Sequence, residues 1–360
     1  AQCLVGSEMC IRDSLGTTSY GDIVKALEEA VAGNHFEEFR DIDYLPDTGS
    51  KRVLTTGGHF GYLKIAEGCD KHCTYCIIPK LRGKFRSVPM ERLIAQAEDM
   101  AEQGVKELIL VAQETTVYGK DLYGKKSLHI LLKKLCEIRG IRWIRILYCY
   151  PEEIYDELIE TIRDEKKICH YLDIPIQHAS DRILKRMGRR TSKQELIDIV
   201  GKLRKEIPDI VLRTTLITGF PGETEEDHEE LKEFVDEMEF DRLGVFTYSP
   251  EENTPAAEMA DQVPEEVKEE RRDELMELQQ EISYDRGQDR IGQELLVMIE
   301  GKVADESAYI GRTYGDAPKV DGYIFVQTGE LLMTGDFAKV RVTGALEYDL
   351  IGVLSDEYTE

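Results

Sequence analysis

Short apolar runs alternate with amphipathic stretches six times from about residue 60 onward, and this alternation constrains the fold more than any other feature. The runs are rich in Val, Ile, Leu or aromatic residues and have the length of strands, at 62–65, 107–112, 143–148, 171–176, 210–217 and 243–248. The stretches between them predict helices at 89–103, 127–139, 151–163, 191–205 and 223–237. Repeated strand–helix units predict an α/β fold with a parallel sheet. Because a complete (β/α) barrel needs more units than this, a partial barrel and a doubly wound sheet fit the pattern equally well.

The pattern changes after residue 264. Residues 264–287 are highly charged and contain few turn formers, which predicts a long helix that bridges two domains. Runs separated by Gly, Asp and Pro then predict a small five-stranded antiparallel β-barrel, with strands at 294–303, 309–313, 322–327, 338–342 and 349–354. The length of 360 residues fits two or three domains. We place the domains at 1–50, 55–287 and 288–355.

Charge and composition restrict the class of partner. The sequence has 46 Lys and Arg against 71 Asp and Glu, a formal net charge of −25. A field of this sign argues against a general nucleic-acid binder and leaves a basic protein as a partner. No apolar run reaches the roughly 18 residues of a membrane span, and no signal peptide is visible at the N-terminus. We therefore expect a cytoplasmic protein without a membrane partner.

Three of the eight cysteines lie within eight residues of one another, at Cys69, Cys73 and Cys76. A disulfide framework is not expected in a chain of this length without a signal peptide. The spacing C-x3-C-x2-C follows the first predicted strand, and one short loop could turn all three sulfurs toward a cubane iron–sulfur cluster. Three ligands would leave one iron open for chemistry. The alternatives are a zinc site completed by His72 and a chance cluster of cysteines.

This motif, with Tyr75 before its last cysteine, resembles the signature of radical S-adenosylmethionine (SAM) enzymes. The resemblance implies that Cys69, Cys73 and Cys76 hold a 4Fe–4S cluster whose open iron is chelated by the methionine end of SAM. It also implies that one-electron reduction cleaves SAM to methionine and a 5′-deoxyadenosyl radical. The fold implied for the first domain is a six-stranded partial (β/α) barrel.

The resemblance extends over residues 15–355 to the radical SAM methylthiotransferases. It is carried by four long motifs: EGCDKHCTYCIIPKLRGKFRSVP (67–89), LVAQETTVYG (110–119), LDIPIQHASDRILKRMGR (172–189) and TTLITGFPGETEEDHEEL (214–231). The C-terminal segment resembles the TRAM domain, a small substrate-binding barrel. Two branches of this family exist: MiaB-like enzymes modify an adenosine in tRNA, and RimO-like enzymes modify an aspartate in ribosomal protein S-twelve of the small subunit.

The RimO-like branch is favoured by two features of the C-terminal segment. GRTYGDAPKVDGYIFV (311–326) and ALEYDLIGVL (345–354) resemble that branch. Residues 291–360 hold five basic and thirteen acidic residues, a net charge of −8, which repels RNA and suits a basic ribosomal protein. The alternative explanation of this negative charge is an acidic surface that only contacts solvent. A tRNA methylthiotransferase and a non-catalytic cluster-containing module remain the competing hypotheses.

Further site residues are expected at the ends of the predicted strands, where α/β folds bind ligands. The resemblance implies that Gln113 and Glu114 contact the methionine end of SAM, with a plain surface role as the alternative for Glu114. Gln177, beside His178, would face the same rim, although a strand-end histidine is often only hydrogen-bonded. Arg213 could reach the SAM carboxylate or ribose through a charge-assisted bond. Backbone at a turn containing Gly219 and Phe220 could approach the adenosine. Tyr75 completes the set of expected cofactor contacts.

The resemblance implies that a deoxyadenosyl radical abstracts hydrogen from the aspartate β-carbon, sulfur is inserted, and a second SAM supplies the methyl group. In the family, a second 4Fe–4S cluster on three N-terminal cysteines supports sulfur delivery. Here residues 15–31 match the end of that N-terminal domain, residues 1–14 look foreign, and Cys3 is a weak candidate ligand. We therefore expect a truncated chain in which the second cluster is lost. The function expected is that of an aspartate methylthiotransferase; the alternative, if the chain is truncated in nature, is a protein that cleaves SAM without transferring sulfur. A flavodoxin or ferredoxin would be the reductant.

Overall fold

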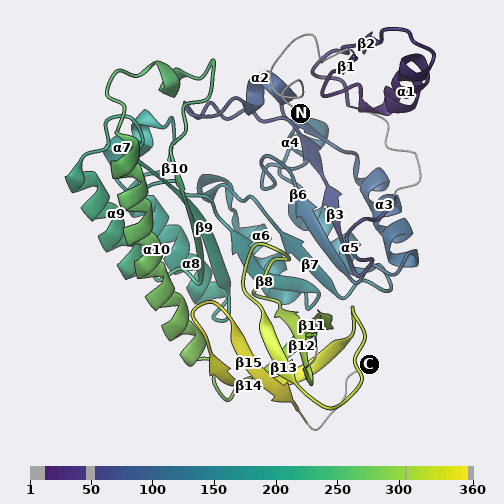
Figure 1. Ribbon diagram of the computed structural model, residues 1–360, viewed down its shortest axis with the longest axis vertical. Helices are drawn as coiled ribbons and strands as arrows, with labels where there is room; N and C mark the ends of the chain where they lie inside the picture. Colours follow the sequence, from purple (N-terminus) through teal and green to yellow (C-terminus); the bar gives the residue numbers. More distant parts are fainter. Residues whose placement is uncertain (1–12, 46–52, 305, 356–360) are drawn as a thin grey trace.

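The computed structural model describes residues 13–45, 53–304 and 306–355. Three parts follow one another along the chain (Figure 1): a small N-terminal unit, a curved parallel sheet with helices outside it, and a small barrel beneath the sheet. Within these residues, no helix is both long and apolar enough to cross a membrane.

The sheet is parallel throughout its six strands in the described residues. Its strands are β3 (Phe60–Lys64), β6 (Glu107–Val111), β7 (Trp143–Ile146), β8 (Ile168–Asp173), β9 (Val211–Thr218) and β10 (Arg242–Thr247). They lie in sequence order, and the edge strands β3 and β10 do not pair with each other among the described residues. A doubly wound sheet would reverse its strand order at a switch point. The structure therefore confirms the partial barrel.

Amphipathic helices cover the outer face of the sheet, as the sequence predicts. They are α3 (Met90–Glu102), α5 (Leu128–Cys136), α6 (Asp156–Asp164), α8 (Lys193–Glu206) and α9 (Glu225–Met238). Their apolar faces pack with the sheet in one continuous core, in which Leu63, Leu93 and Leu108 are fully buried. Burial of this apolar surface is the main force that holds the helices on the sheet.

Shorter elements lie between these strands and helices. They are the antiparallel pair β4 (Ala66–Glu67) and β5 (Arg86–Ser87), α2 (Ile78–Arg82), α4 (Lys120–Tyr123), α7 (Asp181–Arg186), and the 3-10 turns η4 (Pro151–Glu153) and η5 (Pro255–Glu258). Several bounds differ from the prediction, mostly by one to three residues, and two of the differences concern β8 and α6. Strand β8 ends at Asp173 rather than residue 176, because Pro175 has no N–H to continue the ladder. The predicted helix 151–163 is divided into η4 and α6.

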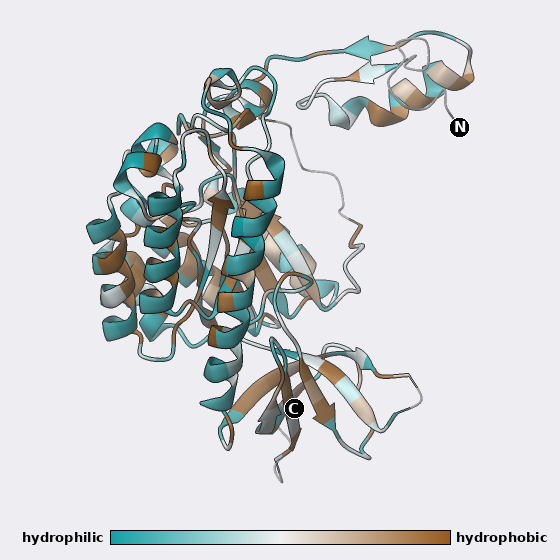
Figure 2. Cartoon of the chain, turned by 60° about the vertical axis from the view of Figure 1, so that its left-hand side comes forward, coloured by the Kyte–Doolittle hydropathy of each residue, from teal (hydrophilic) through white to brown (hydrophobic). Residues whose placement is uncertain are grey.

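The N-terminal unit is small and lies beside the cysteine end of the sheet (Figure 2). It contains β1 (Ser14–Leu15) paired with β2 (Glu37–Glu38), the 3-10 turn η3 (Tyr20–Asp22) and α1 (Ile23–Val31). Its Thr17 hydroxyl donates a 2.9 Å hydrogen bond to the Leu81 carbonyl of α2. Cys3, the weak candidate ligand for a second cluster, lies outside the described residues, so the structure does not test that prediction.

The C-terminal barrel follows the 24-residue helix α10 (Glu265–Gln288). Its strands are β11 (Glu294–Lys302), β12 (Ala308–Thr313), β13 (Ile324–Gln327), β14 (Phe337–Ala345) and β15 (Leu350–Leu354), closed in the order β11–β12–β13–β15–β14. The prediction of a five-stranded barrel is confirmed, with one difference in strand direction. Strand β15 inserts between β13 and β14, so it is antiparallel to β14 and parallel to β13.

The barrel packs under the amino ends of the sheet strands, opposite the rim where the cysteines lie. Trp143 at the start of β7 meets Phe337 of β14 edge to face at 4.8 Å, within a small apolar cluster that both domains share. Beside it, Glu107 accepts hydrogen bonds from Arg145 of the sheet at 2.8 Å and from Arg312 of the barrel at 2.6 Å. All three charged side chains are fully buried.

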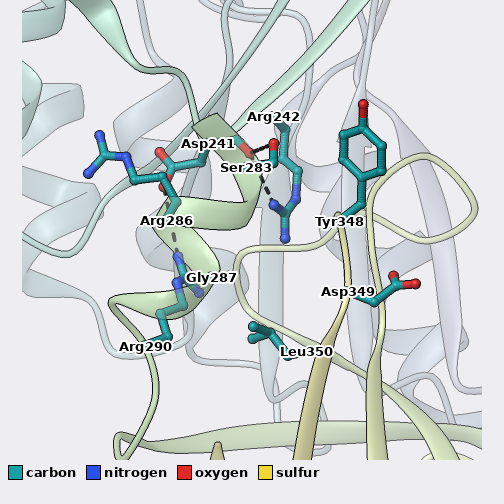
Figure 3. Close-up of a pocket in the computed structure, with 9 residues that line it drawn as sticks. All are labelled: Asp241, Arg242, Ser283, Arg286, Gly287, Arg290, Tyr348, Asp349 and Leu350. Carbon is teal, nitrogen blue, oxygen red and sulfur yellow. Dashed lines mark hydrogen bonds and ion pairs between the residues drawn. The ribbon is translucent and has the colours of Figure 1, made fainter. Parts of the chain in front are cut away.

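Segment 311–326 therefore lies at the junction of the domains, where its side chains close the amino end of the partial barrel. Asp316 accepts a 2.6 Å bond from Arg242, and Asp321 accepts a 2.8 Å bond from the hydroxyl of Tyr171. The end of α10 closes a second side of this junction (Figure 3), around a cavity of about 10 Å³. Gly287 is required there, because an added Cβ would lie 2.9 Å from the Ala345 Cβ.

Candidate active site

The cysteine loop leaves the carboxyl end of β3 and is fixed to the neighbouring segments by main-chain hydrogen bonds. The Cys69 N–H donates to the Gly83 carbonyl at 3.2 Å, and the Thr74 N–H donates to the Met187 carbonyl at 2.9 Å. Gly68 precedes the loop with a φ of 76°, and an added Cβ there would overlap the Lys84 carbonyl. Main-chain contacts therefore contribute directly to the shape of this loop.

All three cysteines are free thiols in sheltered positions: Cys69 and Cys73 are buried and Cys76 is half-buried. Burial raises the pKa of Cys69 to about 11 and also raises the pKa of Cys76. Desolvation disfavours a thiolate, so a positively charged metal centre is what would stabilise the ionised ligands here. The sulfurs thus fit a metal cluster better than they fit free catalytic thiols.

A zinc site completed by His72 is not formed in the described residues. His72 is exposed, and no group of three His, Cys, Asp or Glu residues in this part of the chain is arranged around a single metal ion. A cubane cluster presents a different iron atom to each cysteine, so its ligands need not meet at one ion. The arrangement therefore favours the cluster over the zinc alternative.

A cleft of about 430 Å³ opens beside Cys69. This volume lies in the range of small-molecule sites, about 300–1,000 Å³. Its walls come from the cysteine loop and from the segments after β6, η4 and α7, and include Lys71, Glu114, Glu153 and Arg190. The cleft therefore places charged groups of both signs next to a cysteine.

Glu114 and Gln113 supply unpartnered polar atoms at this rim. Glu114 is 1% exposed, so the alternative of a surface role is wrong. Its Oε1 accepts bonds from the main-chain N–H and the hydroxyl of Thr116, whereas its Oε2 is buried without a partner, as is Gln113 Oε1. Burial raises the pKa of Glu114 to about 7. Buried acceptors without donors indicate a ligand that supplies N–H groups, as the amine of SAM would.

Gln177 lies at the same rim, in a strained backbone conformation with a φ of 75°. Its N–H donates to the Thr215 carbonyl at 2.9 Å, and its carbonyl accepts from the Ile217 N–H at 2.8 Å. The next residue, His178, is fully buried, and its Nδ1 accepts main-chain bonds from the two residues after it. His178 is therefore a hydrogen-bonded structural residue.

Phe220 and Tyr75 are brought together by the structure. Phe220 is fully buried, and its ring meets the rings of Tyr75 at 6.5 Å and Tyr248 at 5.3 Å, both edge to face. The turn before it requires a glycine, because Gly219 has a φ of 66° and an added Cβ would overlap the Lys268 side chain. The turn therefore holds an aromatic wall against the cysteine motif.

Arg213 lies on β9, in register with Asp173 at the carboxyl end of β8. Its Nη1 donates to Asp173 at 2.7 Å, and its Nε lies 3.4 Å from Asp321 of the barrel. The structure therefore places its charge in an ion pair that joins the two domains, and its contact with SAM stays a prediction.

Two residues that the sequence did not single out complete the surroundings of the cysteines. The Tyr150 hydroxyl lies 3.6 Å from Cys73 Sγ, and the guanidinium of Arg189 lies 4.3 Å from the centre of the Tyr150 ring. The only sequence signal for Tyr150 is its place just after the third strand, equivalent to that of Gln113 after the second. The only sequence signal for Arg189 is that it lies in a basic stretch after Gln177.

Comparison with protein families assigns both domains. Residues 63–235 match the model of the radical SAM superfamily, and residues 291–354 match that of the TRAM domain. Among solved structures, coproporphyrinogen III oxidase (HemN) from Escherichia coli, described as a radical SAM enzyme, superposes with a TM-score of 0.50. The match is 16% identical and covers 78% of this chain and 66% of that one, which supports the fold alone.

Curated relatives match almost the whole chain. A protein of Lachnoclostridium phytofermentans named ribosomal protein uS12 methylthiotransferase RimO is 65% identical over 338 residues, covering 94% of this chain and 77% of the relative. A protein of Clostridium perfringens with the same name is 52% identical over 345 residues, covering 95% and 77%. Identity at this level over this length shows common family membership.

Proposed function

The chain belongs to the ribosomal protein uS12 methylthiotransferase (RimO) family of radical SAM enzymes, and from this premise we propose that it methylthiolates the β-carbon of an aspartate in uS12. The observation that carries the proposal is the loop of Cys69, Cys73 and Cys76 at the carboxyl end of the sheet, beside a cleft with unpartnered buried acceptors. The names of the relatives supply the substrate.

The family implies a 4Fe–4S cluster and SAM as cofactors. We assign the cluster to Cys69, Cys73 and Cys76, and the amine of SAM to the free oxygens of Gln113 and Glu114. When bound, these groups supply the one-electron chemistry that cleaves SAM and removes hydrogen from the substrate. The aromatic wall of Tyr75 and Phe220 excludes water from one side of the site.

The side chains of this site hold charge in fixed positions before any ligand binds. Lys71 donates to Glu152 at 3.1 Å and to Glu153 at 2.6 Å, and Lys126 lies 2.8 Å from the other oxygen of Glu153. These pairs neutralise one another at the mouth of the cleft. Arg190 lines the same cleft and is exposed, and we propose it as a contact for the carboxylate of the substrate aspartate.

The charge that a partner meets on the barrel is smaller than the sequence total suggests. Glu300, Asp316 and Asp321 are held in ion pairs with Arg or His side chains at the domain junction. The other acidic side chains of the described barrel are Glu294, Glu306, Glu330, Asp336, Glu347 and Asp349. With Asp305, Asp356, Glu357 and Glu360 they make ten acidic residues, against the four basic residues Lys302, Lys319, Lys339 and Arg341. Outside the junction, residues 291–360 therefore carry a net charge of −6. We propose that this acidic surface steers a basic protein toward the chain, and that specificity comes from contacts at the cleft.

The remaining assignments follow from the proposed reaction. The three cysteines of the loop account for one cluster in the described residues. A low-potential one-electron donor of the flavodoxin or ferredoxin class would reduce it. A ribosomal protein substrate places the reaction in the cytoplasm.

The proposal is tested by SAM turnover in protein reconstituted with iron and sulfide under reducing conditions. We expect 5′-deoxyadenosine to form, and its rate to rise on adding uS12 but not on adding tRNA. Cys73→Ala should abolish it, whereas Cys136→Ala, which changes a thiol far along the chain on α5, should leave it unchanged. Stimulation by tRNA alone would instead support the tRNA branch, and no turnover in any arm would refute the assignment.

A further inference from the structure

The hydroxyl of Tyr150 hydrogen-bonds a cysteine of the site. Its oxygen lies 3.6 Å from Cys73 Sγ, within the range for a bond to sulfur. Cys69 Sγ differs, because it accepts from the main-chain N–H of Lys71 at 3.4 Å, a bond that no side-chain substitution removes. The bond from Tyr150 to Cys73 can therefore be removed by a single substitution.

The direction of this bond follows from the chemistry of its two ends. A phenol with an ordinary pKa of about 10 carries its proton at neutral pH. A cysteine that binds iron has lost its proton and can only accept. Tyr150 would therefore donate to the sulfur of Cys73.

Two cations hold the Tyr150 ring in place. The guanidinium of Arg189 lies 4.3 Å from the ring centre and is anchored by a 2.8 Å bond from its Nη2 to the Pro175 carbonyl. The Lys71 ammonium lies 5.0 Å from the same ring centre. Tyr150 is 7% exposed and Arg189 is also 7% exposed, so solvent does not screen these contacts appreciably. Positive charge over an aromatic face is attractive and withdraws electron density from the ring, which strengthens the hydroxyl as a donor.

Arg189 has no other strong attachment in the described residues. Its Nε and Nη1 are buried and make no hydrogen bond. A buried guanidinium with two free N–H groups is costly unless negative charge lies nearby. An anionic cluster bound at Cys73, on the far side of the Tyr150 hydroxyl, would supply that charge.

We propose that Tyr150, held by Arg189, tunes the reduction potential of the cluster through its hydrogen bond to Cys73. Hydrogen bonds to cluster sulfurs are among the factors that set the potential, because they stabilise the more negative, reduced state. The inference rests on the proposed function in one respect, that Cys73 is a cluster ligand. Tyr150 is a positioning and tuning residue rather than a catalytic one.

The test is a redox titration of reconstituted protein in which the cluster is followed by absorbance and electron paramagnetic resonance. Tyr150→Phe removes the hydroxyl and keeps the ring. At the potential where the wild-type cluster is half reduced, we expect the ratio of reduced to oxidised cluster to fall about tenfold, a downward shift of about 59 mV for one electron. Arg189→Lys keeps the charge and the hydroxyl but loses the stacked plane, so its shift should have the same sign and be smaller.

Tyr155→Phe is the matched control. Tyr155 is a half-buried tyrosine whose hydroxyl lies 3.0 Å from His129 Nδ1. Removal of the Tyr155 hydroxyl should leave the reduction potential of the cluster unchanged.

Three results are decisive. Equal iron content with an unshifted potential in Tyr150→Phe would overturn this inference and leave the proposed function standing. Failure of the wild-type protein to bind a cluster would refute the proposed function and the inference together. If Tyr150→Phe does not take up iron, the Arg189→Lys titration decides, and an unshifted potential there would overturn the inference.

Discussion

Replacing Arg312 by Met should weaken the junction between the sheet and the barrel more than any exposed substitution. Arg312 donates to Glu107 and Glu300 at 2.6 Å each and to the Asp316 carbonyl at 2.9 Å. It is fully buried, as is Glu107. Met has similar length and no charge, so the substitution removes the ion pair while leaving little cavity.

The magnitude follows from what Arg312→Met leaves behind. Removing one partner of a buried ion pair costs about 3–5 kcal/mol, because the other charge remains buried. Glu107 keeps its 2.8 Å bond from Arg145, and Glu300 keeps its 2.8 Å contact with His59. The loss should therefore lie at the lower end, about 3 kcal/mol, or roughly a hundredfold in the unfolding equilibrium constant.

The chain provides its own probe for this measurement. Its single tryptophan, Trp143, is 5% exposed and packs on Phe337 of the barrel, so its fluorescence reports on the junction. Urea unfolding of Arg312→Met should be compared with Arg341→Met, which removes an exposed 3.0 Å pair with Glu294. Exposed pairs contribute at most about 1 kcal/mol. Equal transitions for the two variants would refute the reasoning that the junction depends on buried charge.

Three further predictions concern the rim and the partner. Because burial raises the pKa of Glu114 from 4.5 to about 7, the metal-free protein should lose about 3 kcal/mol of stability as the pH rises through that window. Glu114→Gln should remove this loss when urea unfolding is compared at about pH 5 and about pH 8. An unchanged dependence of stability on pH in Glu114→Gln would contradict the prediction. Gly219→Ala should lower the affinity for SAM at least about tenfold without changing the iron content, because the added methyl overlaps Lys268 and the backbone conformation favours glycine. Gly201→Ala, with open space around the added methyl, should leave the affinity unchanged. Calorimetry measures both affinities. Binding of uS12 should weaken steeply between low and physiological salt, because residues 291–360 carry a net charge of −6 outside the domain junction. Binding that does not change with salt would contradict an electrostatic role for this surface.

The strand order and the cysteine loop could be predicted from the sequence because their signals are local. Each strand is a short apolar run next to an amphipathic helix, and Cys69, Cys73 and Cys76 are close neighbours in the chain. The position of Tyr75 at the carboxyl-end rim of the sheet could be predicted for the same reason, because the cysteine motif and the strand ends are both visible in the sequence.

What could not be predicted depends on contacts between distant residues. Tyr150 and Cys73 are 77 positions apart, and Arg312 and Glu107 are 205 apart. The parallel pair of β13 and β15 arises because the last strand inserts between two earlier ones, an arrangement without a local signal. Arg213 lies on a predicted strand, but its ion-pair partner Asp321 belongs to another domain, so this pair has no local signal in the sequence.

The central claim is that this chain removes hydrogen from an aspartate β-carbon of uS12, and isotope transfer tests it most directly. Reconstituted protein should be given SAM, a reductant and uS12 deuterated at the β-carbons of its aspartates. The account predicts deuterium in the 5′-deoxyadenosine that forms, and none with Cys73→Ala. Formation of 5′-deoxyadenosine without deuterium, at the same rate with and without uS12, would contradict it.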